Sequence, residues 1–222
     1  MGELWQKRLM VAGFEKTFEL GRQFRNEGIS SEHLQDYSQM EFYWAYANYE
    51  DGMKLVEEMY KYIAKQTIGM LKFTSRGFKI DLSKPWKKID YVSEIKKQTG
   101  IDFFKATVED IEVKLAKLGI EFEPDLEKER LIDLLWKYCR KNIAGPAFLV
   151  NHPVEVSPLA KRNPKNKNVV ERFVILIAGS ELGNGYSELN DPIDQENRFQ
   201  RQQELRKAGD EEAQMHDKDF VE

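Results

Sequence analysis

Two runs near the start of the chain carry the residue types best suited to binding chemistry. Residues 21–30 read GRQFRNEGIS and residues 40–50 read MEFYWAYANYE, which predicts a strand, a loop and a returning strand. Because successive side chains on a strand point to opposite faces, Arg25 and Glu27 share one polar face. An arginine and carboxylates on one face of a hairpin suit a ligand that carries both phosphate and amine groups.

Both strands of this hairpin have a polar face and a bulky apolar face. On the returning strand, Glu41 and Tyr43 are followed on the same face by Ala45 and Ala47, which leaves room for a ligand. The opposite faces carry the large side chains Phe18, Leu20, Phe24, Met40, Phe42, Trp44 and Tyr46. We expect these apolar faces to be buried against helices. The alternation alone also fits a half-buried sheet whose polar face is simply solvated.

A second group of polar residues lies in the run SELGNGYSELND, residues 180–191. Three of its residues share parity on a strand: Asn184, Tyr186 and Glu188. Glu181 has the opposite parity, and Gly183 and Gly185 allow a bulge or a close approach of backbone to ligand. A carboxylate beside a phenol and an amide suits an ammonium group. The alternative is a glycine-softened strand with a surface glutamate.

Composition indicates a soluble globular protein of the reducing cytosol. The 222 residues are 41% hydrophobic and 32% charged, with no apolar run that could span a bilayer and no signal-peptide pattern. The single cysteine, Cys139, follows a helical apolar pattern and is interpreted as a packing residue. The histidines at 33, 152 and 216 show no metal-ligand spacing. The net charge of −4 gives no general attraction for nucleic acid.

The rest of the chain divides into helical and strand-like segments. A short helix or a turn is predicted over residues 3–12, and helices over 52–68, 90–100, 107–118 and 126–141 and after Pro192. Asp51 and Asp90 are expected to cap two of them, and Thr107 with Asp110 resembles a capping box. A hairpin is expected over residues 70–83, and strands over 147–152, 172–179 and 180–189. The basic loop at 159–168 is either solvated or a contact for phosphate or tRNA.

The polar runs closely resemble those of a known enzyme family. FRNEGIS, the following His33 and MEFYWAYANYED resemble motif 2 of the class II aminoacyl-tRNA synthetases, in the form seen in lysyl-tRNA synthetases. PVEVSPLAKR, the RF pair at 172–173 and GSELGNGYSELNDPIDQ are similar to the run that the family has between motifs 2 and 3. The resemblance implies an α+β fold, with an antiparallel sheet flanked by helices and incomplete at both ends. It also implies that residues 1–222 are a partial catalytic domain with a helical insertion at 84–145 and no anticodon-binding domain.

The family activates lysine with ATP and Mg²⁺ to lysyl-adenylate and then transfers the lysyl group to tRNA. By this resemblance Arg25 bridges the amino-acid carboxylate and the α-phosphate, and is the expected catalytic residue. The expected ATP-binding residues are Arg25, Glu27, His33, Tyr37 and Glu181, of which Tyr37 stands where the family usually has phenylalanine. The expected lysine-binding residues are Arg25, Glu41, Tyr43, Asn184, Tyr186 and Glu188.

Within the lysine pocket that the resemblance implies, Glu188 and Tyr43 are the expected partners of the ε-ammonium group. Glu181 resembles a magnesium-binding carboxylate. The family usually has a second acidic residue on the preceding strand, where this chain has Val174. With valine at this position, the chain lacks one of the two acidic residues of the family's usual metal arrangement.

The implied partners are lysine, ATP, Mg²⁺ and tRNA(Lys), with either a homodimer or a complementary half of the enzyme, and a cytoplasmic location. Motif 1, the glycine-rich motif 3 and an anticodon-binding domain are expected to be missing from this stretch. Two other functions stay open. One is a ligase of the same fold that attaches lysine to a protein. The other is a non-catalytic paralogue that binds lysine or nucleotide, which Val174 favours.

Overall fold

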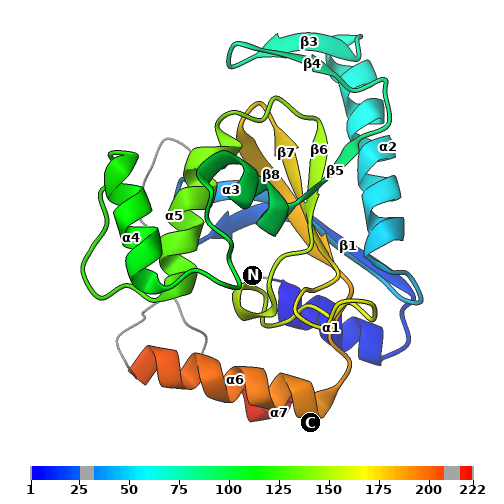
Figure 1. The fold of residues 1–222 in the computed structure, drawn as a ribbon. Coiled ribbons are helices and arrows are strands. Elements are labelled where there is room, and N and C mark those ends of the chain that lie inside the picture. Colours follow the sequence, from blue (N-terminus) through cyan, green and yellow to red (C-terminus); the bar gives the residue numbers. More distant parts are fainter. Residues whose placement is uncertain (1, 26–32, 208–215, 222) are drawn as a thin grey trace. The chain divides into compact units, whose positions relative to one another are not determined.

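The computed structural model describes residues 2–25, 33–207 and 216–221 and divides the chain into two compact units, 1–47 and 48–222 (Figure 1). The first unit contains α1 (Glu3–Val11), β1 (Lys16–Phe24) and β2 (Asp36–Trp44). This confirms the predicted helix and the strand, loop and returning strand. No helix in the described part of the chain is long and apolar enough to cross a membrane.

In the first unit, β1 and β2 pair antiparallel and α1 packs on their polar face. The Thr17 hydroxyl donates a hydrogen bond to Gln6 Oε1 over 3.1 Å, which ties α1 to that face. The apolar face is open: Phe18 is 76% exposed, Leu20 71% and Phe24 68%. The expectation that this face is buried against helices is therefore wrong for these residues, because the helix of this unit covers the opposite face.

The second unit is built on a four-stranded sheet in the order β5-β6-β7-β8. Its strands are β5 (Lys87–Asp90), β6 (Ala147–Val150), β7 (Arg172–Ile177) and β8 (Ser180–Tyr186). The strands predicted for the second half of the chain are thereby confirmed, whereas β5 was not predicted. β5 runs parallel to β6 and the other two pairs are antiparallel, so the α+β class holds with one parallel pair in the sheet.

Helices cover both faces of this sheet (Figure 1). On one face lies α2 (Tyr49–Ile68), where Gly52 approaches the Phe173 ring. The other face is covered by α3 (Tyr91–Thr99) and α5 (Lys128–Arg140), with α4 (Val108–Lys117) packed on α5. Their main core residues on this side include Leu131, Leu135, Leu149, Val174 and Leu176. Because β6 and β7 are buried on both faces, their sequences read as unbroken apolar runs.

Hydrogen bonds from side chains set the helix starts, and one predicted cap was wrong. Asn48, rather than Asp51, is the N-cap of α2: its Oδ1 accepts from the backbone N–H groups of Glu50 and Asp51. Asp51 instead accepts from the Asn48 backbone and completes a capping box. The predicted cap at Asp90 and the predicted box of Thr107 and Asp110 are confirmed.

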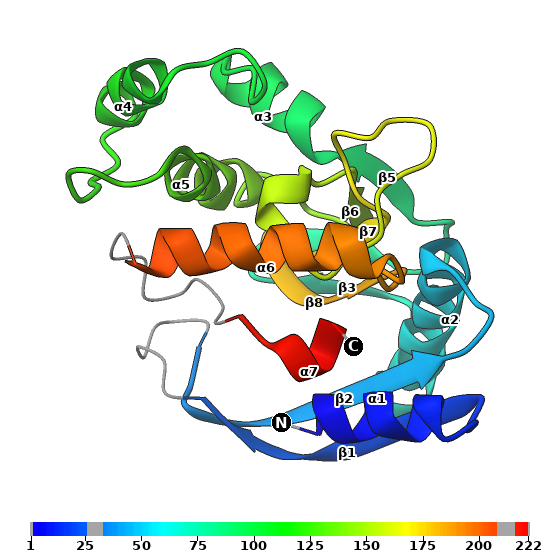
Figure 2. The same cartoon turned by 90° about the horizontal axis from the view of Figure 1, so that it is seen from below.

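The remaining elements lie at the edges of the second unit. β3 (Lys72–Ser75) and β4 (Phe78–Asp81) form the predicted hairpin, whose turn at Arg76 and Gly77 has two positive φ angles. A 3₁₀ turn spans Val154–Val156. Figure 2 shows α7 (Lys218–Val221) alongside α6 (Pro192–Lys207), where His216 Nε2 lies 2.8 Å from a Glu196 carboxylate oxygen.

Candidate active site on two polar strand faces

The polar face of β1 and β2, called here the hairpin face, carries Arg25, Tyr37, Glu41 and Tyr43. In the register Glu19 pairs with Glu41 and Gln23 with Tyr37, and the Arg25 backbone N–H donates to Gln35 O over 2.9 Å. Partners in an antiparallel pair point to the same side, so these four side chains share one face. The expectation that Glu41 and Tyr43 share a face is confirmed.

At one end of the hairpin face, the carboxylate of Glu41 is held by two donors. The Tyr43 hydroxyl donates to Glu41 Oε1 over 3.0 Å, and Gln39 Nε2 donates to Glu41 Oε2 over 3.4 Å. Because hydrogen bonds already fix this carboxylate, less side-chain conformational entropy is lost when it binds a cation.

The middle of the hairpin face has an opening at Gly21. This residue lies opposite Gln39, between the Glu19–Glu41 pair and the Gln23–Tyr37 pair. A Cβ atom built on Gly21 would meet no other atom within 4 Å. The missing side chain therefore lets a ligand approach the backbone between the arginine end and the glutamate end.

Helix α1 brings two residues to this face that the sequence analysis missed. Lys7 Nζ lies 3.2 Å from Glu3 Oε1 and 5.9 Å from the centre of the Tyr43 ring. The protein's own ammonium group thus lies between a carboxylate and a phenol ring. The Glu–Lys spacing of four on a helix was the available signal, but it says nothing about which strand the helix covers.

The structure does not test the roles expected for two ATP-binding residues of the hairpin, His33 and Glu27. His33 is exposed and precedes β2. Glu27 lies outside the described residues. Their roles therefore stay predictions.

The second polar face belongs to β8 and carries Glu181, Asn184, Tyr186 and Glu188; it is called here the β8 face. In the register with β7, Val174 pairs with Asn184 and Leu176 with Glu181. Between these pairs one residue of β7, Ile175, lies opposite two residues of β8, Leu182 and Gly183, which is a bulge. Gly183 has a φ of 153°. The bulge returns Glu181 to the same side as Asn184 and Tyr186.

The expectation that Glu181 points to the opposite face is therefore wrong. Simple alternation fails here because the extra residue shifts the parity of everything before it. The glycines that permit the bulge were visible in the sequence, but its position was not.

Glu181 also contacts the helical layer. Trp136 Nε1 on α5 donates to Glu181 Oε1 over 2.5 Å. On β7, Val174 lies two residues from Leu176, the register partner of Glu181; it is buried and supplies no ligand atom. Among the residues that the structure describes, no group of three or more His, Cys, Asp or Glu side chains could hold a metal ion. Glu181 by itself does not form a cage for a resident metal.

Glu188 continues the β8 face beyond the end of the strand. It forms an isolated antiparallel bridge with Ala160, flanked by a hydrogen bond from the Lys161 N–H to Ser187 O over 2.8 Å. Ala160 belongs to a loop, residues 157–160, that is held by α6, because Arg198 Nη1 donates to the carbonyl oxygens of Ser157 and Ala160.

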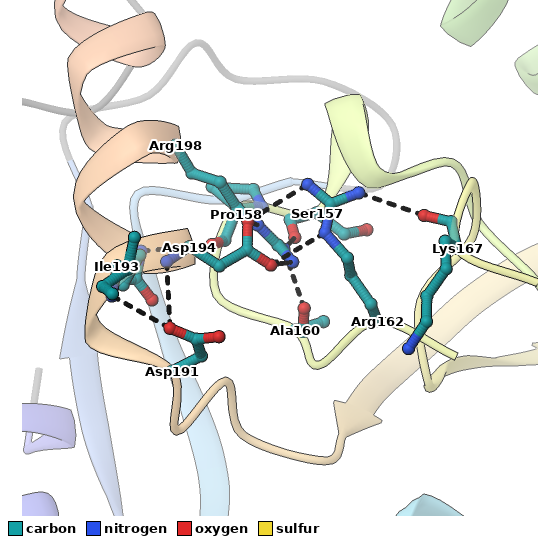
Figure 3. A network of polar contacts seen from close by, with 10 residues as sticks. Ser157, Pro158, Ala160, Arg162, Lys167, Asp191, Ile193, Asp194 and Arg198 are labelled. Carbon is teal, nitrogen blue, oxygen red and sulfur yellow. Dashed lines mark hydrogen bonds and ion pairs between the residues drawn. The ribbon is translucent and has the colours of Figure 1, made fainter. Parts of the chain in front are cut away.

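Asp194 holds this anchor in place. Figure 3 shows its carboxylate between the guanidinium groups of Arg162 and Arg198, with N–O distances of 2.8 Å to each. Hydrogen bonds from Arg198 and then Arg162 hold the pKa of Asp194 well below its usual value, so the carboxylate stays ionised. The network therefore fixes the backbone beside Glu188.

Buried polar groups lie beneath the β8 face. The His152 ring packs at 5.0 Å from the Tyr91 ring, and burial followed by the charge of Arg172 lowers the pKa of His152, which is therefore neutral. Arg172 Nη1 donates to Ser157 Oγ over 3.0 Å.

Cys139 is fully buried, and burial raises the pKa of its thiol to about 11, which fits the predicted packing role.

Comparison with known proteins identifies the family to which this chain belongs. The family model of the class II tRNA synthetases of the D, K and N group matches residues 2–222. The chain belongs to this family. The class II synthetase fold expected from the sequence is thereby confirmed.

Similar proteins within the family carry the name lysine–tRNA ligase. The one from Thermosipho africanus is 46% identical over 219 residues, which are 99% of this chain and 43% of that protein. Those from Moorella thermoacetica and Thermotoga maritima are 44% and 43% identical over 99% of this chain. The chain thus spans 43 to 45% of the length of these synthetases.

Proposed function

We propose that this chain is the lysine- and ATP-binding part of the catalytic domain of a lysine–tRNA ligase. The order of side chains on the hairpin face carries the proposal: Arg25 lies at one end and the hydrogen-bonded Glu41 and Tyr43 at the other. An amino acid charged at both ends needs a cation for its carboxylate and an anion for its ammonium group. Relatives named lysine–tRNA ligase support the same choice of amino acid.

In the proposed reaction, a carboxylate oxygen of lysine attacks the α-phosphorus of ATP. The bond between that phosphorus and the bridging oxygen of the leaving group breaks, and pyrophosphate departs with the electron pair. Lysyl-adenylate remains, and a ribose hydroxyl of the tRNA then attacks its carbonyl carbon and releases AMP. The nucleophile of the first step belongs to the substrate, so no nucleophile from the protein is required.

The protein's part in the first step is binding and charge stabilisation. Arg25 clamps the lysine carboxylate and the α-phosphate, which lowers the entropy cost of their encounter and stabilises charge at phosphorus. Glu27, His33 and Tyr37 contribute to ATP binding. Glu41 and Asn184 contribute to lysine binding, as do Tyr186, Glu188 and Tyr43. A neutral side chain in place of the lysine ammonium would not offset the charge of Glu188, which gives selectivity.

Magnesium enters this proposal together with ATP. Mg²⁺ is commonly held by one or two carboxylates, by substrate phosphates and by water. Glu181 supplies one carboxylate, and Val174 supplies none where the family usually has an acid. This fits a Mg²⁺ ion that arrives on the ATP phosphates better than a resident ion.

The direct test is lysine-dependent exchange of pyrophosphate into ATP by the 222-residue chain. We expect Arg25→Ala to reduce the exchange rate at least about a hundredfold, because it removes the clamp. Arg22→Ala is the matched control, since Arg22 lies on the opposite face in an exposed ion pair with Asp36. Equal rates in the two variants would exclude the role of Arg25.

A second candidate is a protein that binds lysine or nucleotide without catalysis, which the valine at position 174 favours. Lysine binding without exchange would support this candidate. The proposal has three further parts that can be tested on the same chain. The acceptor of the lysyl group is tRNA(Lys) or, in the alternative, a protein. The assembly is a homodimer or a pair with a complementary half of the enzyme, and the location is cytoplasmic.

A further inference from the structure

The helical layer of the second unit makes a direct contact with the β8 face. Trp136 lies on α5 and is 2% exposed, and its indole N–H donates to Glu181 Oε1 over 2.5 Å. A hydrogen bond to an ionised carboxylate is about twice as strong as one between neutral groups. With Oε1 engaged, the second carboxylate oxygen is left for a cation.

Packing fixes the position of the indole ring. The Trp136 ring lies 5.4 Å from the Tyr91 ring, which in turn lies 5.0 Å from the His152 ring. Leu135 and Cys139 on the same helix are fully buried in the core that contains Trp136. Rotation of the indole would open a cavity in this core, so its N–H has one available direction.

Another buried tryptophan shows that such a contact is not a general consequence of burial. Trp86 is 7% exposed and packs against Phe148 at 5.0 Å and Tyr60 at 5.6 Å. Its Nε1 has no hydrogen-bond partner among the residues described. The two tryptophans thus share size and burial and differ in the bond to a carboxylate.

We propose that Trp136 is a positioning residue that orients the Glu181 carboxylate toward Mg²⁺–ATP. The inference rests on the proposed function, in which Glu181 meets the magnesium ion that ATP carries. It gives α5 a role beyond packing, because the helix lies on the side of the sheet that carries Glu181 and sets the geometry of a nucleotide-binding group there.

The first test compares Trp136→Phe with Trp86→Phe by calorimetric titration of the chain with Mg²⁺ and a non-hydrolysable ATP analogue, and separately with lysine. Both variants lose an indole from a buried aromatic cluster, but only Trp136→Phe loses a bond to Glu181. We expect Trp136→Phe to weaken nucleotide affinity about tenfold, the usual scale for one hydrogen bond to a charged group, and to leave lysine affinity unchanged. Trp86→Phe should change neither affinity.

The second test observes the contact itself through the indole N–H resonances of the chain labelled with ¹⁵N. Of the four tryptophans, Trp136 alone should shift on Glu181→Gln, and it should also shift on addition of Mg²⁺ and the analogue. An indole N–H resonance of Trp136 whose chemical shift is unchanged by Glu181→Gln would overturn the inference. Equal nucleotide affinities in the two tryptophan variants would also overturn it. If the unmodified chain binds no nucleotide at all, the proposed function fails together with the inference.

Discussion

At the scale of single residues, this chain uses hydrogen bonds to fix its carboxylates before any ligand arrives. Glu41 accepts from Tyr43 and Gln39, and Glu181 accepts from Trp136. A carboxylate held this way has already lost its rotational freedom, so less entropy is lost when a cation binds. We therefore expect substitutions of the donor residues to weaken cation binding as well.

The opening at Gly21 provides a prediction at this scale. Gly21→Val places a β-branched side chain on the hairpin face where no atom lies within 4 Å, so the free energy of unfolding should change by less than about 1 kcal/mol. Lysine or nucleotide affinity should fall at least about tenfold, since the side chain fills the space that the ligand uses. Calorimetric titration and urea unfolding measure the two effects.

Ser38→Val serves as the control for this variant. Ser38 is an exposed residue one position away in the register, on the opposite face of the hairpin. The Ser38→Val variant introduces the same valine side chain and should alter neither the lysine affinity nor the nucleotide affinity. An unchanged affinity in Gly21→Val would mean that no ligand approaches the backbone there.

At the scale of elements, patterns confined to a few neighbouring residues were predictable and longer-range pairing was not. The caps at Asp90 and Thr107 follow from local chemistry, since a short oxygen-bearing side chain meets the first free N–H groups of a helix. The true cap of α2 was missed because Asn48 and Asp51 both have capping chemistry and occupy the two ends of one capping box.

The candidate site shows the same division. The hairpin face was predictable because its alternation is unbroken from Glu19 to Arg25 and from Tyr37 to Tyr43. The side of Glu181 was not, because a bulge changes parity and its position depends on the pairing of β8 with β7. The bond from Trp136 joins residues 45 positions apart, which no local pattern reveals.

The turn before β6 provides a prediction about elements. A Cβ atom on Gly145, at φ 70°, would lie 2.2 Å from the backbone oxygen of Leu176. Gly145→Ala should therefore lower the free energy of unfolding by at least about 3 kcal/mol, because strained φ and a backbone clash add. Gly100→Ala is the control: its φ is 82° with nothing within 4 Å, so about 1 kcal/mol is expected.

Urea unfolding of the two variants distinguishes the contributions. Equal losses would mean that only the positive φ matters at Gly145 and that the approach to β7 is looser than the distance indicates. A larger loss in Gly145→Ala would support the close packing of this turn against the strand that precedes the β8 face.

At the scale of the whole molecule, a partly buried network of charges links α6 to the loop that pairs with Glu188. Asp194 is 17% exposed between Arg162 and Arg198, and Arg198 is 6% exposed. Removing one partner of a largely buried pair leaves the other charge uncompensated. The same network reaches the loop that pairs with Glu188, so it joins the stability of α6 to the geometry of the β8 face.

We predict that Asp194→Asn lowers the free energy of unfolding by about 2 kcal/mol at neutral pH. The pKa of Asp194 is depressed in the folded state, so its contribution is complete above the unfolded pKa of about 4 and is lost as pH falls below that value. The difference between the variant and the unmodified chain should therefore be constant from about pH 5 upward and shrink in acid.

Asp133→Asn is the matched control, because Asp133 pairs with Lys137 at 2.8 Å while both side chains are largely exposed. Its effect should stay below about 0.5 kcal/mol. A difference between Asp194→Asn and the unmodified chain that grows toward low pH would contradict the ionised state of Asp194. Unfolding curves across a pH series give all three stabilities.

The most direct test of the central claim is a calorimetric comparison of lysine with norleucine, which has the same backbone and a similar chain without the ammonium group. We expect the chain to bind lysine and to bind norleucine at least about a hundredfold more weakly, because norleucine leaves a carboxylate of the site unpaired. Glu188→Gln should remove most of that difference. Equal affinity for the two amino acids, or no binding of lysine, would contradict the assignment of this chain as the lysine-binding part of a tRNA ligase.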